Sequence, residues 1–268
     1  MNTSLIGARD RFAQAHPERR VAANGREWGF TRIGESGPAL VLIPGTLGHG
    51  DIFWQPIERL RDRVRILALT YPQSGGIADW AEDLAELMDR AGFGTATVLG
   101  SSLGGVTVQY FAAVHPERVE TMVAANTLSS PGEIAALPQY ANIDGTSIEE
   151  LRAGIAERLR ERARSHPDQA ELSALLLREL EVRISEASLR TRLKALRFAP
   201  ELPEIALPRE RIVTVESDDD PMMTPAMRAR VRARLNPGRS VRFASGGHFP
   251  YVTRPDEYAR MLEQALGV

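Results

Sequence analysis

The chain has 268 residues, with 33 Lys and Arg, 35 Asp and Glu, and no cysteine. This length suits one α/β domain with room for an insertion, and the lack of cysteine excludes disulfide bonds, thiolate metal sites and cysteine nucleophiles. The formal charge of −2 creates no strong long-range field, so we expect neither nucleic acid nor an anionic membrane as a partner.

Short apolar runs alternate with longer helical patterns, which is typical of a mostly parallel sheet flanked by helices. Six apolar runs are expected to be strands: residues 39–44, 64–71, 95–100, 119–126, 211–216 and 240–244. Four helices are expected between or after them, at residues 79–90, 106–114, 225–235 and 255–266. The last two begin with proline, which the first turn of a helix tolerates because its N–H would be unpaired there.

Residues 129–208 break this rhythm and show only helical patterns, at 148–164, 168–184 and 187–197. Because this segment lies between two predicted strands, we expect an inserted helical cap. The predicted division is a core of residues 1–128 and 209–268 with a cap of residues 129–208. The nearly balanced charges of the cap helices predict a solvated surface rather than an anion site.

The sequence Gly100-Ser-Ser-Leu-Gly104 matches the pattern Gly-x-Ser-x-Gly. The pattern alone is common, but here it follows a predicted strand directly and precedes a predicted buried helix. That context is the one a nucleophile elbow requires, in which a sharp turn exposes a serine at the edge of a sheet. We therefore expect Ser102 to be the nucleophile.

A serine hydroxyl needs a neighbouring base, and the chain has five histidines. His248 lies in Ser245-Gly-Gly-His-Phe-Pro250, directly after the last predicted strand, where the base of an elbow-type hydrolase belongs. We expect His248 to be the catalytic base. The others are expected to be non-catalytic: His16, His49, His115 and His166.

The base needs a carboxylate that fixes its tautomer. The predicted strand at 211–216 runs into Ser217-Asp-Asp-Asp-Pro221. Neighbouring aspartates repel one another, so at least one should have a partner, and we expect Asp220 to be the triad acid, with Asp219 as the alternative. A cation site built from this run is disfavoured because no second ligand cluster is visible, and we expect no metal and no cofactor.

Acyl transfer also needs hydrogen-bond donors for a developing oxyanion. One is expected to be the backbone N–H of Leu103, which follows the nucleophile. The second should come from the loop Pro44-Gly-Thr-Leu-Gly48, with Thr46 as the first choice and Leu47 as the alternative.

These motifs, in this order, resemble those of the α/β-hydrolase superfamily from about Arg26 onward. A narrower resemblance is to maspardin-type members, carried by Leu69-Thr-Tyr-Pro72, Gly100-Ser-Ser-Leu-Gly-Gly-Val106 and Gly246-Gly-His-Phe-Pro-Tyr251. The resemblance implies an α/β-hydrolase fold. In the maspardin group the histidine position can hold a non-catalytic residue, whereas this chain has His248 there.

The leading hypothesis is therefore a serine hydrolase that cleaves an ester or thioester of a small or medium apolar substrate. The alternatives are a maspardin-like binding or scaffold protein, and the same triad used for C–C bond hydrolysis or cofactor-free peroxidation. The charged N-terminus and the lack of any apolar run of about 20 residues predict a cytoplasmic protein without membrane insertion. The oligomeric state stays open, with a homodimer as one candidate.

Overall fold

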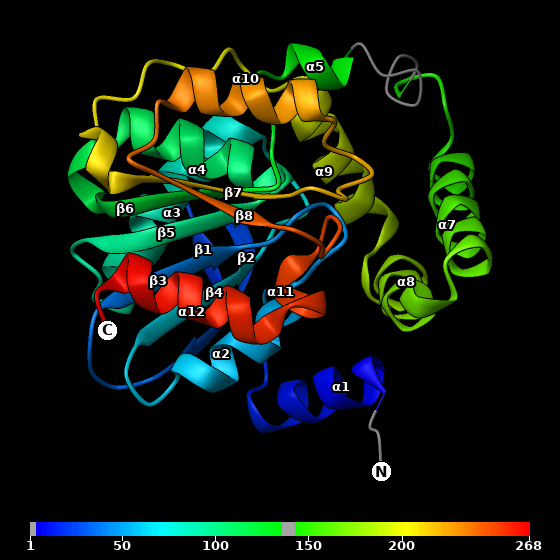
Figure 1. The fold of residues 1–268 in the computed structure, drawn as a ribbon, viewed down its shortest axis with the longest axis horizontal. Helices are drawn as coiled ribbons and strands as arrows, with labels where there is room; N and C mark the ends of the chain where they lie inside the picture. Colours follow the sequence, from blue (N-terminus) through cyan, green and yellow to red (C-terminus); the bar gives the residue numbers. More distant parts are fainter. Residues whose placement is uncertain (1–3, 136–142) are drawn as a thin grey trace.

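The computed structural model describes residues 4–135 and 143–268, and an eight-stranded sheet lies at its centre (Figure 1). The strand order is β1-β2-β4-β3-β5-β6-β7-β8. Strand β2 is antiparallel to β1 and β4, and all other neighbours are parallel. The strands are β1 (Arg19–Ala23), β2 (Arg26–Ile33), β3 (Ala39–Ile43), β4 (Arg65–Thr70), β5 (Ala96–Ser101), β6 (Val119–Ala125), β7 (Ile212–Ser217) and β8 (Arg239–Phe243).

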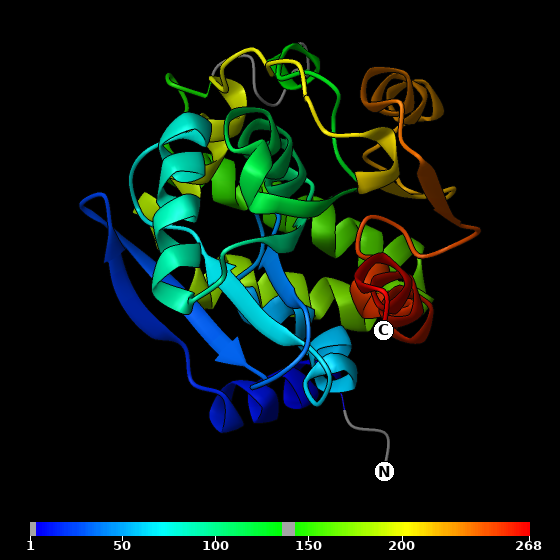
Figure 2. The ribbon, with the colours of Figure 1, turned by 90° about the vertical axis from the view of Figure 1, so that its left-hand side faces the viewer.

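Helices cover both faces of the sheet, as Figure 2 shows from the side. One apolar core includes residues of α3, α4, α9 and α10, and the other includes residues of α1, α2, α8, α11 and α12. The helices of the core layers are α1 (Leu5–Ala15), α2 (Trp54–Leu60), α3 (Ile77–Ala91), α4 (Leu103–Val114), α5 (Gly132–Ala135), α10 (Pro225–Leu235), α11 (Pro250–Thr253) and α12 (Pro255–Leu266). Within residues 4–135 and 143–268, no helix combines the length and apolar character needed to cross a membrane.

The predicted mostly parallel sheet is confirmed, and the six predicted strands are β3 to β8, each displaced by at most one residue at either end. Their apolar runs were recognisable because strands covered on both faces are apolar throughout. The predicted helix at 79–90 begins two residues earlier, at Ile77, and the one at 106–114 begins at Leu103, directly after the Gly-Ser-Ser turn.

The sequence analysis missed the antiparallel hairpin of β1 and β2. Its turn is Asn24-Gly25, and both residues have a positive φ, 45° and 78°. This dipeptide is a strong hairpin signal because asparagine and glycine tolerate that conformation. The hairpin is fixed to α3 by the buried Asp83, which accepts hydrogen bonds from Arg26 and, at 2.8 Å, from the indole N–H of Trp28.

The inserted segment forms α7 (Ile148–Ser165), α8 (Ala170–Arg178) and α9 (Glu186–Arg197), with α7 and α8 at one end of the sheet in Figure 1. The single helix predicted at 168–184 is divided. A 3₁₀ turn at Pro167–Gln169 precedes α8, and a π-helical turn follows at Glu179–Arg183. The C-terminal end of α9 packs into the first apolar core, and α8 packs into the second. The boundary between a core of residues 1–128 and 209–268 and a cap of residues 129–208 therefore stays a prediction.

The expectation of a wholly solvated charged surface on the cap helices is wrong at two positions, because Glu179 and Arg192 are fully buried. The carboxylate of Glu179 contacts the guanidinium of Arg9 on α1, His49 Nδ1 at 2.8 Å and Arg183 Nη1 at 2.6 Å. Arg183 in turn forms a bidentate ion pair with Asp51, in which Nη1 donates to Oδ1 at 2.9 Å and Nη2 donates to Oδ2 at 2.7 Å. This cluster joins α1, the loop after β3 and the inserted helices.

The partners of Glu179 decide its charge state. Burial alone would raise its pKa, but the hydrogen bond from His49 and the charges of Arg183, His49 and Arg9 outweigh it and lower the pKa to about 2. A carboxylate whose native pKa lies below its ordinary value of 4.5 stabilises the fold above pH 4.5, and this contribution is lost as the pH falls towards 2.

We expect Glu179→Gln to lower the free energy of unfolding at pH 7 by about 3 kcal/mol, because the buried Arg9 and the half-buried Arg183 lose a counter-charge. The difference from the unmodified protein should shrink as the pH falls from 4.5 towards 2. Denaturant unfolding at pH 7 and pH 3 measures both quantities.

Glu181→Gln is the matched control, since Glu181 is exposed and its partner Arg160 is 46% exposed. We expect it to change the unfolding free energy by less than about 1 kcal/mol. Equal losses in the two variants, or a loss in Glu179→Gln that does not depend on pH, would contradict the role given to this cluster.

Candidate active site

Ser102 lies in a sharp turn between β5, which ends at Ser101, and α4, which begins at Leu103. Its φ of 55° and ψ of −114° place a non-glycine residue in a strained backbone conformation. Three hydrogen bonds hold the turn: the amide of Ser102 donates to the Ala125 carbonyl at 2.9 Å, and the Ser102 carbonyl accepts from Thr127 Oγ1 at 2.7 Å and from the Val106 amide at 3.2 Å. The half-buried serine is therefore held at the N-terminus of a buried helix.

Two glycines permit this arrangement. A β-carbon on Gly104 would lie 2.3 Å from the Ile43 carbonyl oxygen, so only glycine lets α4 begin against the end of β3. A β-carbon on Gly45 would lie 3.2 Å from the β-carbon of Ser102 and 3.8 Å from its Oγ. The loop after β3 is therefore in contact with the nucleophile candidate.

The three consecutive aspartates after β7 have three different partners. Asp218 is exposed and pairs with Arg242. Asp219 accepts from the amides of Gly246 and Gly247 at 3.1 and 2.8 Å. Asp220, which is buried, lies 2.9 and 3.1 Å from Nδ1 of His248.

His248 is buried between its carboxylate partner and the rest of the site, with 4% of its surface exposed. Because Asp220 only accepts hydrogen bonds when ionised, Nδ1 of His248 must carry the proton in this contact, and Nε2 of the neutral ring is then an acceptor. Nε2 is buried and has no hydrogen-bond partner among residues 4–135 and 143–268. The arrangement leaves this nitrogen free to take a proton.

Asp220 keeps its negative charge despite burial. Burial alone would raise its pKa, but the charge of His248 and the hydrogen bonds from His248, Asn126 and the amide of Met222 together lower the pKa to about 2. The amide of Met223 adds a further hydrogen bond at 3.0 Å. The carboxylate is therefore available to stabilise a protonated imidazole.

Asn126, which the sequence analysis did not single out, connects the two halves of the site. Its side-chain amide donates to Asp220 Oδ2 at 2.9 Å and lies 3.4 Å from the carbonyl of Gly247. Its two chain neighbours, Ala125 and Thr127, hold the backbone of Ser102. In the sequence, its only signal was an asparagine at the end of the predicted strand 119–126. In the structure its φ of 43° requires a residue that tolerates the left-handed region.

The candidate oxyanion donors lie on both sides of Ser102. Leu103 occupies the first turn of α4, and Thr46 and Leu47 are half-buried in the loop that contacts the serine through Gly45. Within the described ranges, the backbone amides of these three residues have no protein partner. They are available as donors, with Thr46 and Leu47 as the two candidates for the second oxyanion donor.

The other four histidines lie in other contacts. The ring of His16 packs at a tilt against that of Phe12, with 4.9 Å between the centroids, and His115 lies 3.1 Å from Glu82. His166 caps the C-terminal end of α7 and is exposed. His49 is buried against Glu179, as described above.

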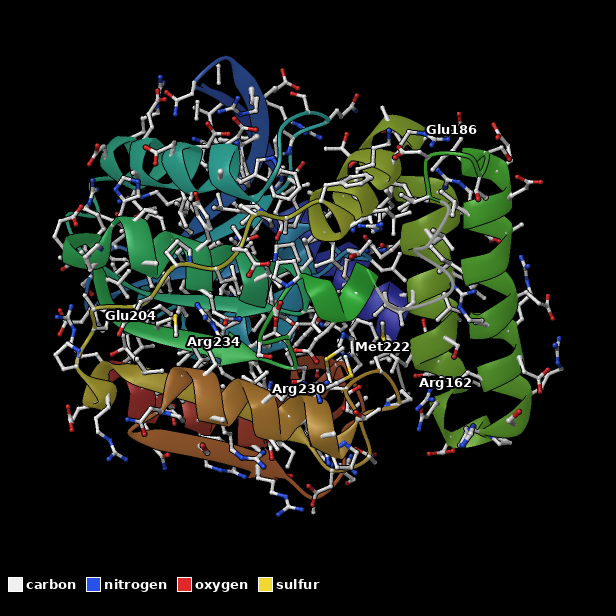
Figure 3. The ribbon with its side chains drawn as sticks, turned by 90° about the horizontal axis from the view of Figure 1, so that it is seen from above. Arg162, Glu186, Glu204, Met222, Arg230 and Arg234 are labelled. Carbon is white, nitrogen blue, oxygen red and sulfur yellow. The ribbon has the colours of Figure 1, made fainter. Side chains whose placement is uncertain are left out.

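Helix α7 approaches the triad loop through one side chain. Arg162 of α7 approaches the loop before His248, with Nη2 4.0 Å from where a β-carbon of Gly247 would lie. In Figure 3, the exposed Met222 lies on the part of the core that faces Arg162 of α7. Leu47 from the loop after β3 and Leu159 from α7 each pack against two of the apolar clusters.

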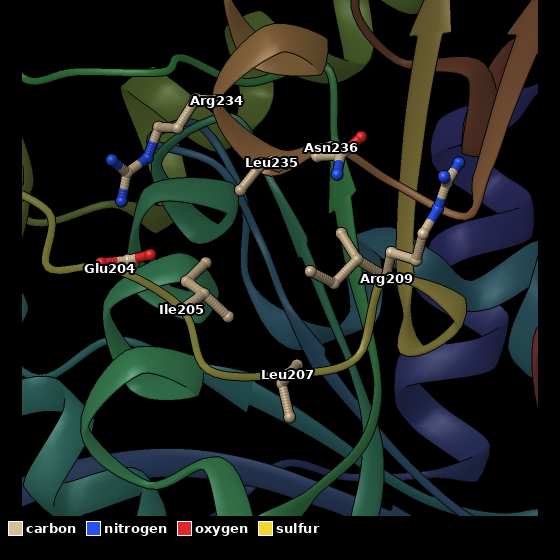
Figure 4. Close-up of a pocket in the computed structure, with 8 residues that line it drawn as sticks. Glu204, Ile205, Leu207, Arg209, Arg234, Leu235 and Asn236 are labelled. Carbon is tan, nitrogen blue, oxygen red and sulfur yellow. The ribbon is translucent and has the colours of Figure 1, made fainter.

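Two surface pockets lie outside the triad itself. One of about 400 Å³ is formed by residues 204–209 and the end of α10, where Glu204 and Arg234 stand at its rim (Figure 4). The other, of about 450 Å³, adjoins Asp219 and Gly246 and is bounded by Leu172 and Arg254. In the part of the chain that is described, no group of three or more His, Asp or Glu side chains could hold a metal ion.

Comparison with known proteins identifies the family. The model of the alpha/beta hydrolase family matches residues 40–261. The chain belongs to the α/β-hydrolase family.

Relatives within this family are distant. Serine hydrolase BPHL of Mus musculus is 30% identical over 126 residues, which are 42% of this chain and 43% of the mouse protein. RutD of Serratia proteamaculans is 27% identical over 84% of this chain and 89% of its own length. The alignment with the mouse relative therefore spans less than half of that protein.

Solved structures share the fold. The enol-lactonase of Burkholderia xenovorans LB400 superposes with a TM-score of 0.77 at 21% identity, over 93% of this chain and all of that one. The esterase RhEst1 of Rhodococcus sp. ECU1013 gives a TM-score of 0.72 at 18% identity, over 93% of this chain and 98% of that one. At these identities the likeness establishes the α/β-hydrolase fold alone. The narrower maspardin resemblance finds no support among these relatives.

We expect Asn126→Gly to lower the rate of serine modification by a fluorophosphonate about tenfold, because Asp220 loses a charged hydrogen bond. Glycine retains the left-handed backbone conformation, so the fold should survive. The second-order rate constant of inactivation and the thermal unfolding midpoint provide the measurements.

Asn236→Gly is the matched control, since Asn236 has the same conformation, with a φ of 42°, at the end of α10. It should react as fast as the unmodified protein and keep its thermal unfolding midpoint, because glycine is well accepted at an exposed left-handed helix end. An undiminished rate in Asn126→Gly would show that this residue does not hold the acid in place.

Proposed function

We propose that this member of the α/β-hydrolase family is a serine hydrolase that cleaves an ester or thioester through a triad of Ser102, His248 and Asp220. The observation that carries the proposal is the paired His248 and Asp220, tied through Asn126 to the same strand end that holds Ser102. Nothing in this arrangement requires a cofactor for nucleophilic attack, since serine, base and acid all come from the chain.

The proposed reaction has two halves. Nε2 of His248 takes the proton of Ser102 as Oγ attacks the substrate carbonyl, and Asp220 stabilises the imidazolium that forms. The amides of Leu103 and of Thr46 or Leu47 stabilise the negative oxygen. His248 then protonates the leaving group, and water, activated by the same nitrogen, releases the acyl group from Ser102.

The substrate class follows from the surroundings of the triad. The half-buried Leu47, in the loop that contacts Ser102, and the exposed Met222, two residues after Asp220, provide apolar surface near the triad. An apolar wall with few polar groups favours a small or medium acyl chain, since such sites bind by burying apolar surface. We therefore propose esters with short or medium acyl chains, and the segment 129–208 as the cap that covers them.

The first test is labelling with a fluorophosphonate, followed by mass spectrometry of the modified peptide. We expect label on Ser102, because an activated serine attacks phosphorus as it attacks a carbonyl. Ser102→Ala should abolish the label, whereas Ser101→Ala, which changes the adjacent buried serine, should retain it. Label on Ser101, or equal labelling of Ser102→Ala and the unmodified protein, would refute the assignment.

A panel of p-nitrophenyl esters and acyl thioesters of increasing chain length then separates the alternatives. Turnover that depends on Ser102 supports ester or thioester cleavage. Label on Ser102 without turnover would favour C–C bond hydrolysis or peroxidation by the same triad. Neither label nor turnover would favour a non-catalytic binding or scaffold protein.

The acid of the triad is tested by two neighbouring substitutions. We expect Asp220→Asn to lower reactivity by roughly 10³ to 10⁴, because the amide no longer stabilises a protonated histidine. Asp219→Asn should cost less than about tenfold, since Asp219 contacts only backbone amides of the Gly246-Gly247 turn. Fluorophosphonate inactivation rates measure both, and the reverse order would make Asp219 the acid.

A further inference from the structure

Arg192 is a buried cation that forms no ion pair with a carboxylate among the residues that the structure describes. It lies on α9, within the inserted segment, and its side chain is fully buried. Its Nη1 donates to the carbonyl oxygens of Thr46 at 3.0 Å and Gly48 at 2.8 Å. Its guanidinium lies over the ring of Tyr71, 5.4 Å from the centroid.

Such a cation is costly to keep. Removing a guanidinium from water without a counter-ion carries a penalty of several kcal/mol, of which two carbonyls and one aromatic face recover only part. Burial lowers its pKa to about 10, so it still carries its charge at neutral pH. An apolar side chain would fill the same volume at lower cost, so packing alone does not explain Arg192.

The contacts of Arg192 and Tyr71 converge on the candidate oxyanion loop. Tyr71 donates its hydroxyl to the Pro44 carbonyl at 3.1 Å, so the two side chains together hold the carbonyls of residues 44, 46 and 48. A peptide unit is planar, so a carbonyl held in place also fixes the direction of the amide that follows it. The same loop touches Ser102 through Gly45.

We propose that Arg192 is a positioning residue for the oxyanion hole: by holding the Thr46 carbonyl it orients the amide of Leu47, one of the two candidates for the second donor, and it adds a buried positive charge behind that amide. This inference rests on the proposed serine hydrolase chemistry. Negative charge that develops on the substrate oxygen meets donors that need no rearrangement, and the low dielectric of the interior strengthens the effect of the cation. Because Arg192 comes from α9, the inserted helices must be seated on the core for the loop to be held.

The test compares the pH dependence of fluorophosphonate inactivation in the unmodified protein, Arg192→Gln and Arg192→Lys. We expect Arg192→Gln to lower the plateau rate about 10- to 100-fold, less than or equal to the loss of one oxyanion donor. The reversible affinity for the reagent should stay unchanged, because the buried Arg192 does not contact it. The midpoint of the pH profile should stay unchanged in Arg192→Lys, which keeps the positive charge. Arg192→Lys keeps the charge and should react at an intermediate rate.

Arg190→Gln is the matched control on the same helix, since Arg190 is half-buried and bonds only to the Thr146 carbonyl at 3.5 Å. It should react within twofold of the unmodified protein. Tyr71→Phe gives a second measurement should Arg192→Gln fail to fold: it retains the ring beneath Arg192, loses the bond to Pro44, and should lower the plateau several-fold.

The outcomes are distinct. A plateau in Arg192→Gln within twofold of the unmodified protein, or in Tyr71→Phe where the arginine variant does not fold, overturns the role of Arg192 and leaves the proposed function intact. An equal loss in Arg190→Gln, or a shifted pH midpoint in Arg192→Lys, assigns the effect to general damage of the cap or triad and also overturns it. An unmodified protein that takes no label refutes the proposed function itself.

Discussion

The last residue of β6 and the two residues after it fix the relation between the two halves of the candidate site. Ala125 and Thr127 hold the backbone of Ser102, and Asn126 between them holds Asp220 and approaches the Gly247 carbonyl. Strand β6 is paired on both sides, with β5 and β7, so its end cannot shift without disturbing the sheet. Chain segments more than a hundred residues apart therefore take their positions from one short piece of backbone.

Buried charge is concentrated where the inserted helices meet the core. Glu179 balances Arg9, His49 and Arg183, whereas Arg192 meets only carbonyls and an aromatic ring. Apolar contacts would hold the two parts together with less geometric definition, since they have no preferred direction. Hydrogen-bonded charges set an orientation as well, and we infer that the seating of α8 and α9 is specified by these groups.

The sequence predicted those features that depend on local pattern. The central strands were recognisable from apolar runs, and the turn at Ser102 from glycines flanking a serine between strand and helix. The order of Ser102, Asp220 and His248 along the chain followed from the same family pattern, and the structure pairs the latter two. Strand ends differed by a single residue because one residue of a strand end hardly changes the apolar pattern.

What the sequence did not reveal depends on contacts between distant residues. The role of Asn126 rests on partners 94 and 121 positions away, and that of Glu179 on partners 130 and 170 positions away. Nothing in a helical pattern distinguishes Glu179 from the exposed Glu181, or Arg192 from Arg190. The first hairpin is different, because Asn24-Gly25 was a local signal that alternating apolar residues did not reinforce strongly enough.

The first helix, α1, affects the position of α8 and the environment of Glu179. Arg9 supplies part of the positive charge that faces Glu179, and Phe12 packs in the same apolar core as α8. If α1 were detached, water would reach the buried carboxylate of Glu179, and α8 would lose its packing contacts with α1. Helix α1 has eleven residues and contributes none of the proposed catalytic side chains. It nevertheless helps to hold the inserted helices in position.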